Sequence, residues 1–131
     1  MPSVSDVLAI LDRTAPSGSA AAWDPVGLQV GDPAADVSSV AVCHEVTEEV
    51  LGAFGPRPPD LLVTYHPLLF QPTTRFVAGA SPAGRALRLA EAGVSLVVVH
   101  TSFDGAPGGT ADAMASAVGL DAVGPFGGSG Q

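Results

Sequence analysis

The chain contains no lysine and only one cysteine, Cys43, among its 131 residues. A single cysteine excludes an internal disulfide and fits a reducing compartment, so we expect the protein in the cytoplasm. The sequence also lacks a basic start followed by an apolar stretch, the pattern of a secretory signal. No apolar run approaches the roughly 18 residues that a membrane span needs, so we expect no membrane partner.

Positive charge is scarce, because five arginines stand against 13 acidic residues and give a formal net charge of −8. Proteins that bind nucleic acid usually carry a basic stripe, since contacts with phosphates supply most of their affinity. Here the positive side chains are dispersed and form no run: Arg13, Arg57, Arg75, Arg85 and Arg88. This distribution argues against a nucleic-acid partner and against an anionic membrane surface.

The length and hydropathy of the chain predict one folded domain. Apolar residues make up 47% of the sequence, which is enough for a core, and a chain of this size can bury about two-thirds of its unfolded surface. The final residues are rich in glycine. We therefore expect a domain over residues 1–123 and a flexible tail over residues 124–131.

Helix and strand patterns alternate along the sequence. Ser3 and Asp6 form a capping box at the start of the first predicted helix. Three later runs are almost continuously apolar, as in strands that helices cover on both faces. The expected elements are a helix over about 4–15, strands over 40–43, 61–65 and 96–99, a helix that Thr47 caps and that starts with Glu48 and Glu49, and helices over about 82–93 and 110–118. This order predicts an α/β fold, a layered, mostly parallel sheet with flanking helices.

All three histidines of the chain follow predicted strands: His44, His66 and His100. The carboxyl ends of parallel strands meet at one edge of the sheet, so we expect the three imidazoles to gather there. Two carboxylates, Glu45 and Asp104, are close to them in sequence. Imidazole nitrogens and carboxylate oxygens are ligands for divalent ions such as zinc, manganese or iron. The sequence thus predicts a metal site at this edge.

Structural roles compete with each of these interpretations. A histidine after a strand is often only a hydrogen-bonding group, and Asp104 before glycine is typical of a turn. Gly108 and Gly109 precede the last predicted helix, where free N–H groups could bind a phosphate, or they could simply punctuate a loop. Trp23 lies in a long loop and could either pack or contact a ligand.

Five segments follow one another in an order typical of one known family. They read W-D-P-V-G-L over 23–28, V-G-D-P over 30–33, E-V-T over 45–47, Y-H-P-L-L-F over 65–70 and H-T-S-F-D-G-A-P-G-G over 100–109. On these segments the chain resembles the Nif-three-like proteins, also called GTP cyclohydrolase I type 2 homologues. Their corresponding segments are W-D-N-V-G-L, V-G-D-P, D-V-T or D-A-T, H-H-P-L-I-F and H-T-N-L-D-A-A-P-G-G.

The resemblance implies hexamers built around a dinuclear metal centre, with one or two divalent ions per chain. It implies that His66, His100 and Asp104 are metal ligands. Gly108 and Gly109 are candidate substrate-binding residues because of their place before the last predicted helix. Ring opening of GTP is assigned to some members, so the implied substrate is nucleotide-like. In such a site Glu45 is a candidate general base or outer-shell residue.

The chain also departs from the family pattern. Tyr65 stands where the family has the first histidine of H-H-P, so one ligand is changed or lost. His44 has no counterpart and is a candidate replacement, and Tyr65 itself is a further candidate ligand. Family members are longer and carry a His-x-x-x-Glu pair in their closing half, whereas no histidine follows His100 here. The chain could be a fragment or a naturally reduced protein.

Two functions follow from these observations. The first is a divalent-metal-binding protein with hydrolase chemistry, in which the ion lowers the pKa of a bound water and polarises a substrate. The second is a non-catalytic metal-binding, scaffold or regulatory subunit, since three ligands cannot build a two-metal site. A sheet without its usual partner half would expose apolar surface, so self-association is expected in both cases.

Overall fold

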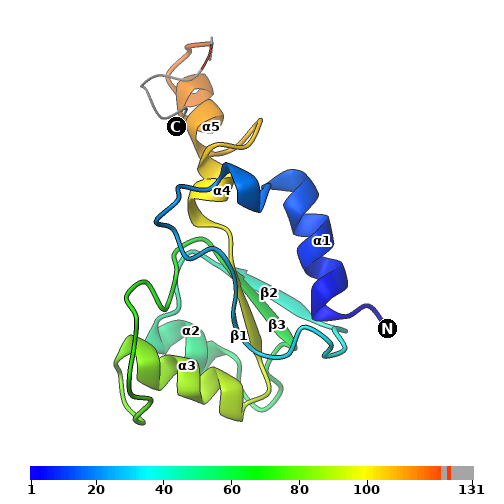
Figure 1. Cartoon of the computed structure of the whole chain (residues 1–131), viewed down its shortest axis with the longest axis vertical. Helices are drawn as coiled ribbons and strands as arrows, with labels where there is room; N and C mark the ends of the chain where they lie inside the picture. The colour runs from blue at the N-terminus through cyan, green and yellow to red at the C-terminus, as the bar shows by residue number, and fades with distance from the viewer. Residues whose placement is uncertain (122–123, 125–131) are drawn as a thin grey trace.

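The computed structural model describes residues 1–121 and Gly124, and it contains a four-stranded sheet with helices on both faces (Figure 1). The tail expected over residues 124–131 lies, apart from Gly124, outside the described residues. The elements in chain order are α1 (Val4–Thr14), a short 3-10 turn η1 (Ser17–Ser19), β1 (Gly27–Val30), β2 (Val40–Cys43), α2 (Glu48–Ala53), β3 (Leu61–Thr64), α3 (Pro82–Glu91), β4 (Ser95–Val98), α4 (His100–Asp104) and α5 (Thr110–Ala117).

Local capping sets where the helices begin. The Ser3 side chain accepts a hydrogen bond from the backbone N–H of Asp6, and the Asp6 carboxylate accepts one from the backbone N–H of Ser3, which confirms the predicted capping box. Thr47 and Ser81 cap α2 and α3 in the same way through their hydroxyl oxygens. These starts agree with the sequence because a cap depends only on neighbouring residues.

The sheet has the strand order β1-β4-β3-β2. Strands β2, β3 and β4 are parallel, as predicted, with Val40 opposite Leu61 and Leu61 opposite Ser95. Strand β1 was not predicted, and it pairs antiparallel with β4 at the sheet edge. Its four residues carry no clear period, so it becomes a strand only because β4 offers an unpaired edge.

Each face of the sheet has its own apolar core. On one face α2 and α3 pack against the strands, with Leu51 and Leu89 beside Leu62 and Leu96. On the other face α1 covers Leu61, Val63 and Val97 through Val4 and its neighbours. Strands β3 and β4 are buried on both faces, as predicted, and Figure 1 shows α1 on the side opposite α2 and α3. The same prediction was wrong for β2, where Val40 and Val42 are exposed because β2 is the edge strand and α1 packs over β3 and β4 instead.

The segment after β4 differs from the prediction. Residues 100–104 form the short helix α4, where the glycines downstream had favoured a loop. Helix α5 follows and extends away from the sheet (Figure 1), and none of its own residues is buried by the part of the chain that the structure describes. Among the described residues, no helix is both long and apolar enough to cross a bilayer.

Candidate functional site

The structure brings the three histidines together at the carboxyl edge of the parallel strands. The ring centres of His44 and His66 are 4.5 Å apart, and those of His66 and His100 are 5.3 Å apart. Backbone hydrogen bonds continue past the strand ends, from His66 N–H to the His44 carbonyl and from His100 N–H to the Tyr65 carbonyl. The buried Thr64 hydroxyl also contacts the carbonyls of His44 and His66. These bonds hold the segments in register beyond the sheet.

Tyr65 lies between the histidines and the carboxylate of Asp104. Its ring stacks on His44 with ring centres 5.2 Å apart and meets His100 edge-on at 5.4 Å. Its hydroxyl donates a hydrogen bond of 2.7 Å to Oδ1 of Asp104. That hydrogen bond, with a contribution from burial, raises the pKa of Tyr65 above its usual value. Tyr65 therefore remains a phenol that supports Asp104.

Asp24 belongs to this site, although the sequence argument did not select it. Its carboxylate oxygens lie 3.0 Å from Nδ1 of His100, and Oδ2 accepts hydrogen bonds from the backbone N–H and the hydroxyl of Thr101. The Asp24 side chain has no exposed surface. Burial acts to raise its pKa, but the hydrogen bonds from Thr101 and His100 outweigh burial and the pKa is lowered. The only signal in the sequence was its place in the W-D-P segment.

His100 adopts an unusual backbone conformation, with φ of +28° at the start of α4. Residues other than glycine rarely occupy positive φ, and such strain persists only where surrounding contacts hold it. Here the contacts are the hydrogen bond from His100 N–H to Tyr65 and the one between its ring and Asp24. A strained residue held on two sides is typical of a functional position.

The histidines and carboxylates do not form a complete preassembled ligand set. Within residues 1–121 and Gly124, no three His, Cys, Asp or Glu side chains form a group that could hold a metal ion. His66 and His100 make a close pair, Asp104 is bonded to Tyr65, and both His44 and Glu45 are exposed at the end of β2. Imidazole nitrogens and carboxylate oxygens are suitable ligands for a divalent ion. Among these groups, only the rings of His66 and His100 are spaced as two ligands of one ion would be.

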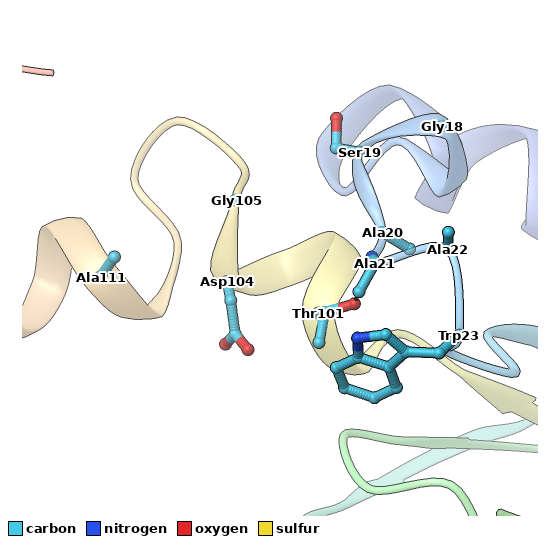
Figure 2. A pocket seen from close by; sticks show the side chains of 10 residues that line it. All are labelled: Gly18, Ser19, Ala20, Ala21, Ala22, Trp23, Thr101, Asp104, Gly105 and Ala111. Carbon is cyan, nitrogen blue, oxygen red and sulfur yellow. Dashed lines mark hydrogen bonds between the residues drawn. The ribbon is translucent and has the colours of Figure 1, made fainter. Parts of the chain in front are cut away.

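A cleft of about 800 Å³ opens beside this edge, between η1 with the following loop and helices α4 and α5. Figure 2 shows the Trp23 ring and the Asp104 carboxylate in it, and Trp23 is 62% exposed. The described residues that line it are Gly18, Ser19, Ala20, Ala21, Ala22, Trp23, Thr101, Asp104, Gly105 and Ala111, none of them basic. The volume is in the range of small-molecule sites.

Gly108 and Gly109 use their N–H groups within the chain. The N–H of Gly108 donates to the Asp112 carboxylate at 2.7 Å, and that of Gly109 donates to the carbonyl of Ala106 at 2.8 Å. A Cβ at Gly109 would lie 1.8 Å from the carbonyl oxygen of Phe103, so this position requires glycine for close packing. Binding of an anion by Gly108 and Gly109 stays a prediction, and it would require their N–H groups to leave their present acceptors, Asp112 and Ala106.

Gln29 on β1 fixes the segment that follows His66. Its side-chain amide nitrogen donates to the carbonyls of Pro25 and Leu69, and its amide oxygen accepts from the N–H of Leu69. The unpredicted strand β1 thereby connects the loop that carries Asp24 with the loop after His66. Both loops of the site are held by the edge strand.

Comparison with known proteins gives one consistent match. A family model described as Duf34/NIF3 (NGG1p interacting factor 3) matches residues 2–130. A "GTP cyclohydrolase 1 type 2 homolog" of Streptomyces coelicolor is 38% identical over 96% of this chain and 44% of its own length. A "GTP cyclohydrolase 1 type 2" of Helicobacter pylori is 32% identical over 79% of this chain and 42% of its own length. The chain thus spans less than half the length of these relatives.

Solved structures match the fold over nearly the whole chain. "Reduced HcgD from Methanocaldococcus jannaschii" has a TM-score of 0.86 at 26% identity, covering 98% of this chain and 52% of that one. A Bacillus cereus protein "related to NIF3" has a TM-score of 0.84 at 25% identity, covering 96% of this chain and 35% of that one. The α/β sheet with its flanking helices is therefore the fold of these proteins over the shared part.

Proposed function

The chain belongs to the Duf34/NIF3 family, and from this premise we propose that it binds a divalent metal ion through His66, His100 and Asp104. The proposed chemistry is hydrolysis of a nucleotide-like substrate. The observation that carries the proposal is the 5.3 Å between the ring centres of His66 and His100. Two imidazoles on a tetrahedral ion, with metal–nitrogen distances of about 2.1 Å, have ring centres about 5 Å apart.

Asp104 supplies the third donor in this proposal. Its Oδ1 accepts the Tyr65 hydroxyl, and that bond leaves Oδ2 as the oxygen we assign to the ion. Carboxylates that bind metals are commonly held by a hydrogen bond of this kind, which orients them. Tyr65, in the position where the family has a histidine, then acts on the ion through Asp104. His44 stacks on Tyr65, is exposed, and is a further candidate ligand for the ion in this proposal.

Zinc, manganese and iron are the candidate ions, because each accepts imidazole together with carboxylate. When bound, the ion would polarise a substrate atom and make a coordinated water more acidic. The residues of this chain would do the remaining work. The cleft would hold the substrate, the exposed Trp23 ring offers a face for an aromatic base, and Glu45 would accept a proton. The name of the Helicobacter pylori relative, GTP cyclohydrolase 1 type 2, supports GTP as the first substrate to try.

A non-catalytic, metal-binding or scaffold role is the second candidate. It is favoured by Tyr65 in a ligand position and by the lack of a three-residue ligand group among the described residues. The first relatives are more than twice as long as the matched part, so a full activity could need residues beyond this chain. Self-association, as in the family hexamers, is proposed for either role. Its support is exposed apolar surface, with Val42 78% and Val118 71% exposed.

Elemental analysis of purified protein tests the proposal. We expect about one equivalent of metal in the wild type, and loss of metal in His66→Ala and Asp104→Ala. Asp121→Ala removes an exposed carboxylate outside the site and should retain the ion. Protein that holds no metal and whose melting temperature is unmoved by millimolar Mn²⁺ or Zn²⁺ would reject metal binding.

Incubation with GTP then separates the two roles. Turnover that needs the ion and is lost in Glu45→Gln supports hydrolysis with Glu45 as the base. Stoichiometric metal without turnover of GTP or other nucleotides supports the scaffold role. Gel filtration of the same samples reports whether the chain forms an oligomer.

A further inference from the structure

We propose that Asp24 is a positioning residue that sets the tautomer of His100, so that Nε2 is the nitrogen presented to the ion. The part concerning the ion rests on the function proposed above, whereas the part concerning the ring stands on geometry. Both Asp24 oxygens lie 3.0 Å from Nδ1 of His100. A carboxylate can only accept hydrogen bonds, so Nδ1 must carry the proton and the neutral ring keeps its lone pair on Nε2.

The chain holds Asp24 in one orientation for this task. Oδ2 accepts the backbone N–H of Thr101 at 3.0 Å and also the Thr101 hydroxyl. That hydroxyl in turn accepts the backbone N–H of Ala21 at 2.9 Å, so its own proton is directed to Asp24. The loop before β1 is thereby fastened to the first turn of α4, which lies 76 residues away in the sequence. The carboxylate is fully covered and cannot turn toward water.

The neighbouring residues restrict the ring as well. Trp23 meets His100 edge-on with ring centres 6.3 Å apart, and Tyr65 meets it at 5.4 Å. The positive φ of His100 is a backbone conformation that residues other than glycine rarely adopt, and the hydrogen bond to Asp24 is one of the contacts that hold it. A purely structural carboxylate would need only the two Thr101 bonds. The additional contact with Nδ1 indicates that Asp24 also orients the imidazole of His100.

Asp24→Asn is the decisive substitution, because it keeps the shape of the side chain and replaces one hydrogen-bond acceptor, a carboxylate oxygen, with a donor, the NH₂ group. The asparagine carbonyl can still accept both Thr101 donors, and its NH₂ group then faces Nδ1. An NH₂ group only donates, and at 3.0 Å from Nδ1 it would oppose a protonated Nδ1. The oxygen that remains lies as close to Nδ1 but already accepts both Thr101 donors, so we expect Nδ1 to become the acceptor and the proton to move to Nε2. The nitrogen assigned to the ion is then blocked without loss of packing. Asp112→Asn is the matched control, since Asp112 bonds to Gly108 and not to a histidine.

The test uses the whole chain labelled with ¹⁵N-histidine and free of metal. Histidine ¹H–¹⁵N correlation spectra, recorded at about pH 8.5 and above where imidazoles are neutral, identify the protonated nitrogen, and His100→Gln assigns the signals. We expect His100 to be protonated on Nδ1 in the wild type and in Asp112→Asn, and on Nε2 in Asp24→Asn. Titration with Zn²⁺ should then show affinity about 10–100-fold weaker in Asp24→Asn only.

A wild-type His100 protonated on Nε2 overturns the inference, and this measurement needs no variant to fold. An unchanged tautomer in folded Asp24→Asn overturns it too. The expected change of tautomer in a chain that binds no Zn²⁺ supports the positioning role and rejects the proposed function. Zn²⁺ affinity that is equal in the wild type and Asp24→Asn, despite the changed tautomer, supports the proposed function and rejects the assignment of Nε2.

Discussion

Tyr65→Phe removes one hydroxyl from the candidate site and leaves the ring in place. The hydroxyl donates to Oδ1 of Asp104 at 2.7 Å, while the ring stacks on His44 and faces His66 and His100. Phenylalanine preserves the ring contacts. The substitution therefore isolates the hydrogen bond to the carboxylate that we assign to the metal ion.

The expected loss of stability follows from the kind of bond and its exposure. A hydrogen bond to a charged group contributes about 1.5–3 kcal/mol, and this one is only half-buried, so we expect about 1.5–2 kcal/mol. Asp104 is partly exposed and can bond to water afterwards, so no penalty for an unsatisfied buried atom is added. For a domain of this size the loss corresponds to a fall in Tm of about 4–10 °C. Metal affinity should fall about tenfold, since Asp104 loses the partner that orients it.

Thermal melts and Zn²⁺ titrations of the wild type and Tyr65→Phe measure both effects. Ser38→Ala is a matched control, because the Ser38 hydroxyl also donates to a carboxylate, Asp60, at the opposite end of the parallel strands. It should lower Tm without changing metal affinity. An unchanged or higher Tm in Tyr65→Phe would refute the energetic reasoning. A fall in Tm with unchanged metal affinity would refute the proposal that Tyr65 orients Asp104 for the ion.

Two further predictions concern the stability of the fold. Gly109→Ala should destabilise the protein by about 1–3 kcal/mol in a denaturant melt, because the new Cβ would lie 1.8 Å from a backbone oxygen. Gly18→Ala is the control, since a Cβ there meets no atom within 4 Å and should leave the stability nearly unchanged. Hydrogen bonds from Ser38 and Ser39 lower the pKa of Asp60 from 3.8 to about 2. Because the folded pKa lies below the unfolded one, this stabilisation is complete above about pH 4 and disappears as the pH falls toward 2. Melts of Asp60→Asn should therefore show a lower Tm than wild type at pH 7, and the gap should close below pH 4; a gap independent of pH would contradict the assignment.

Local signals predicted much of the fold. The Ser3 capping box and the apolar run of 61–65 each depend on residues close together in sequence, and the structure has the capping box as predicted and a strand over 61–64. Strand β1 and helix α4 were missed because neither carries a local pattern. Strand β1 exists through its pairing with β4, and α4 starts at a residue with positive φ that distant contacts hold.

The residues of the candidate site also differ in whether the sequence could predict them. The sequence alone determined that His44, His66 and His100 would lie at one sheet edge, because parallel strands all end on the same side. It could not select Asp24, since nothing near this residue in sequence indicates that it lies against His100. Only the tertiary structure brings them together, through a loop fastened to α4 by hydrogen bonds between residues 76 and 77 positions apart. A hydrogen bond depends on distance in space, and distance in space between remote segments is decided by packing.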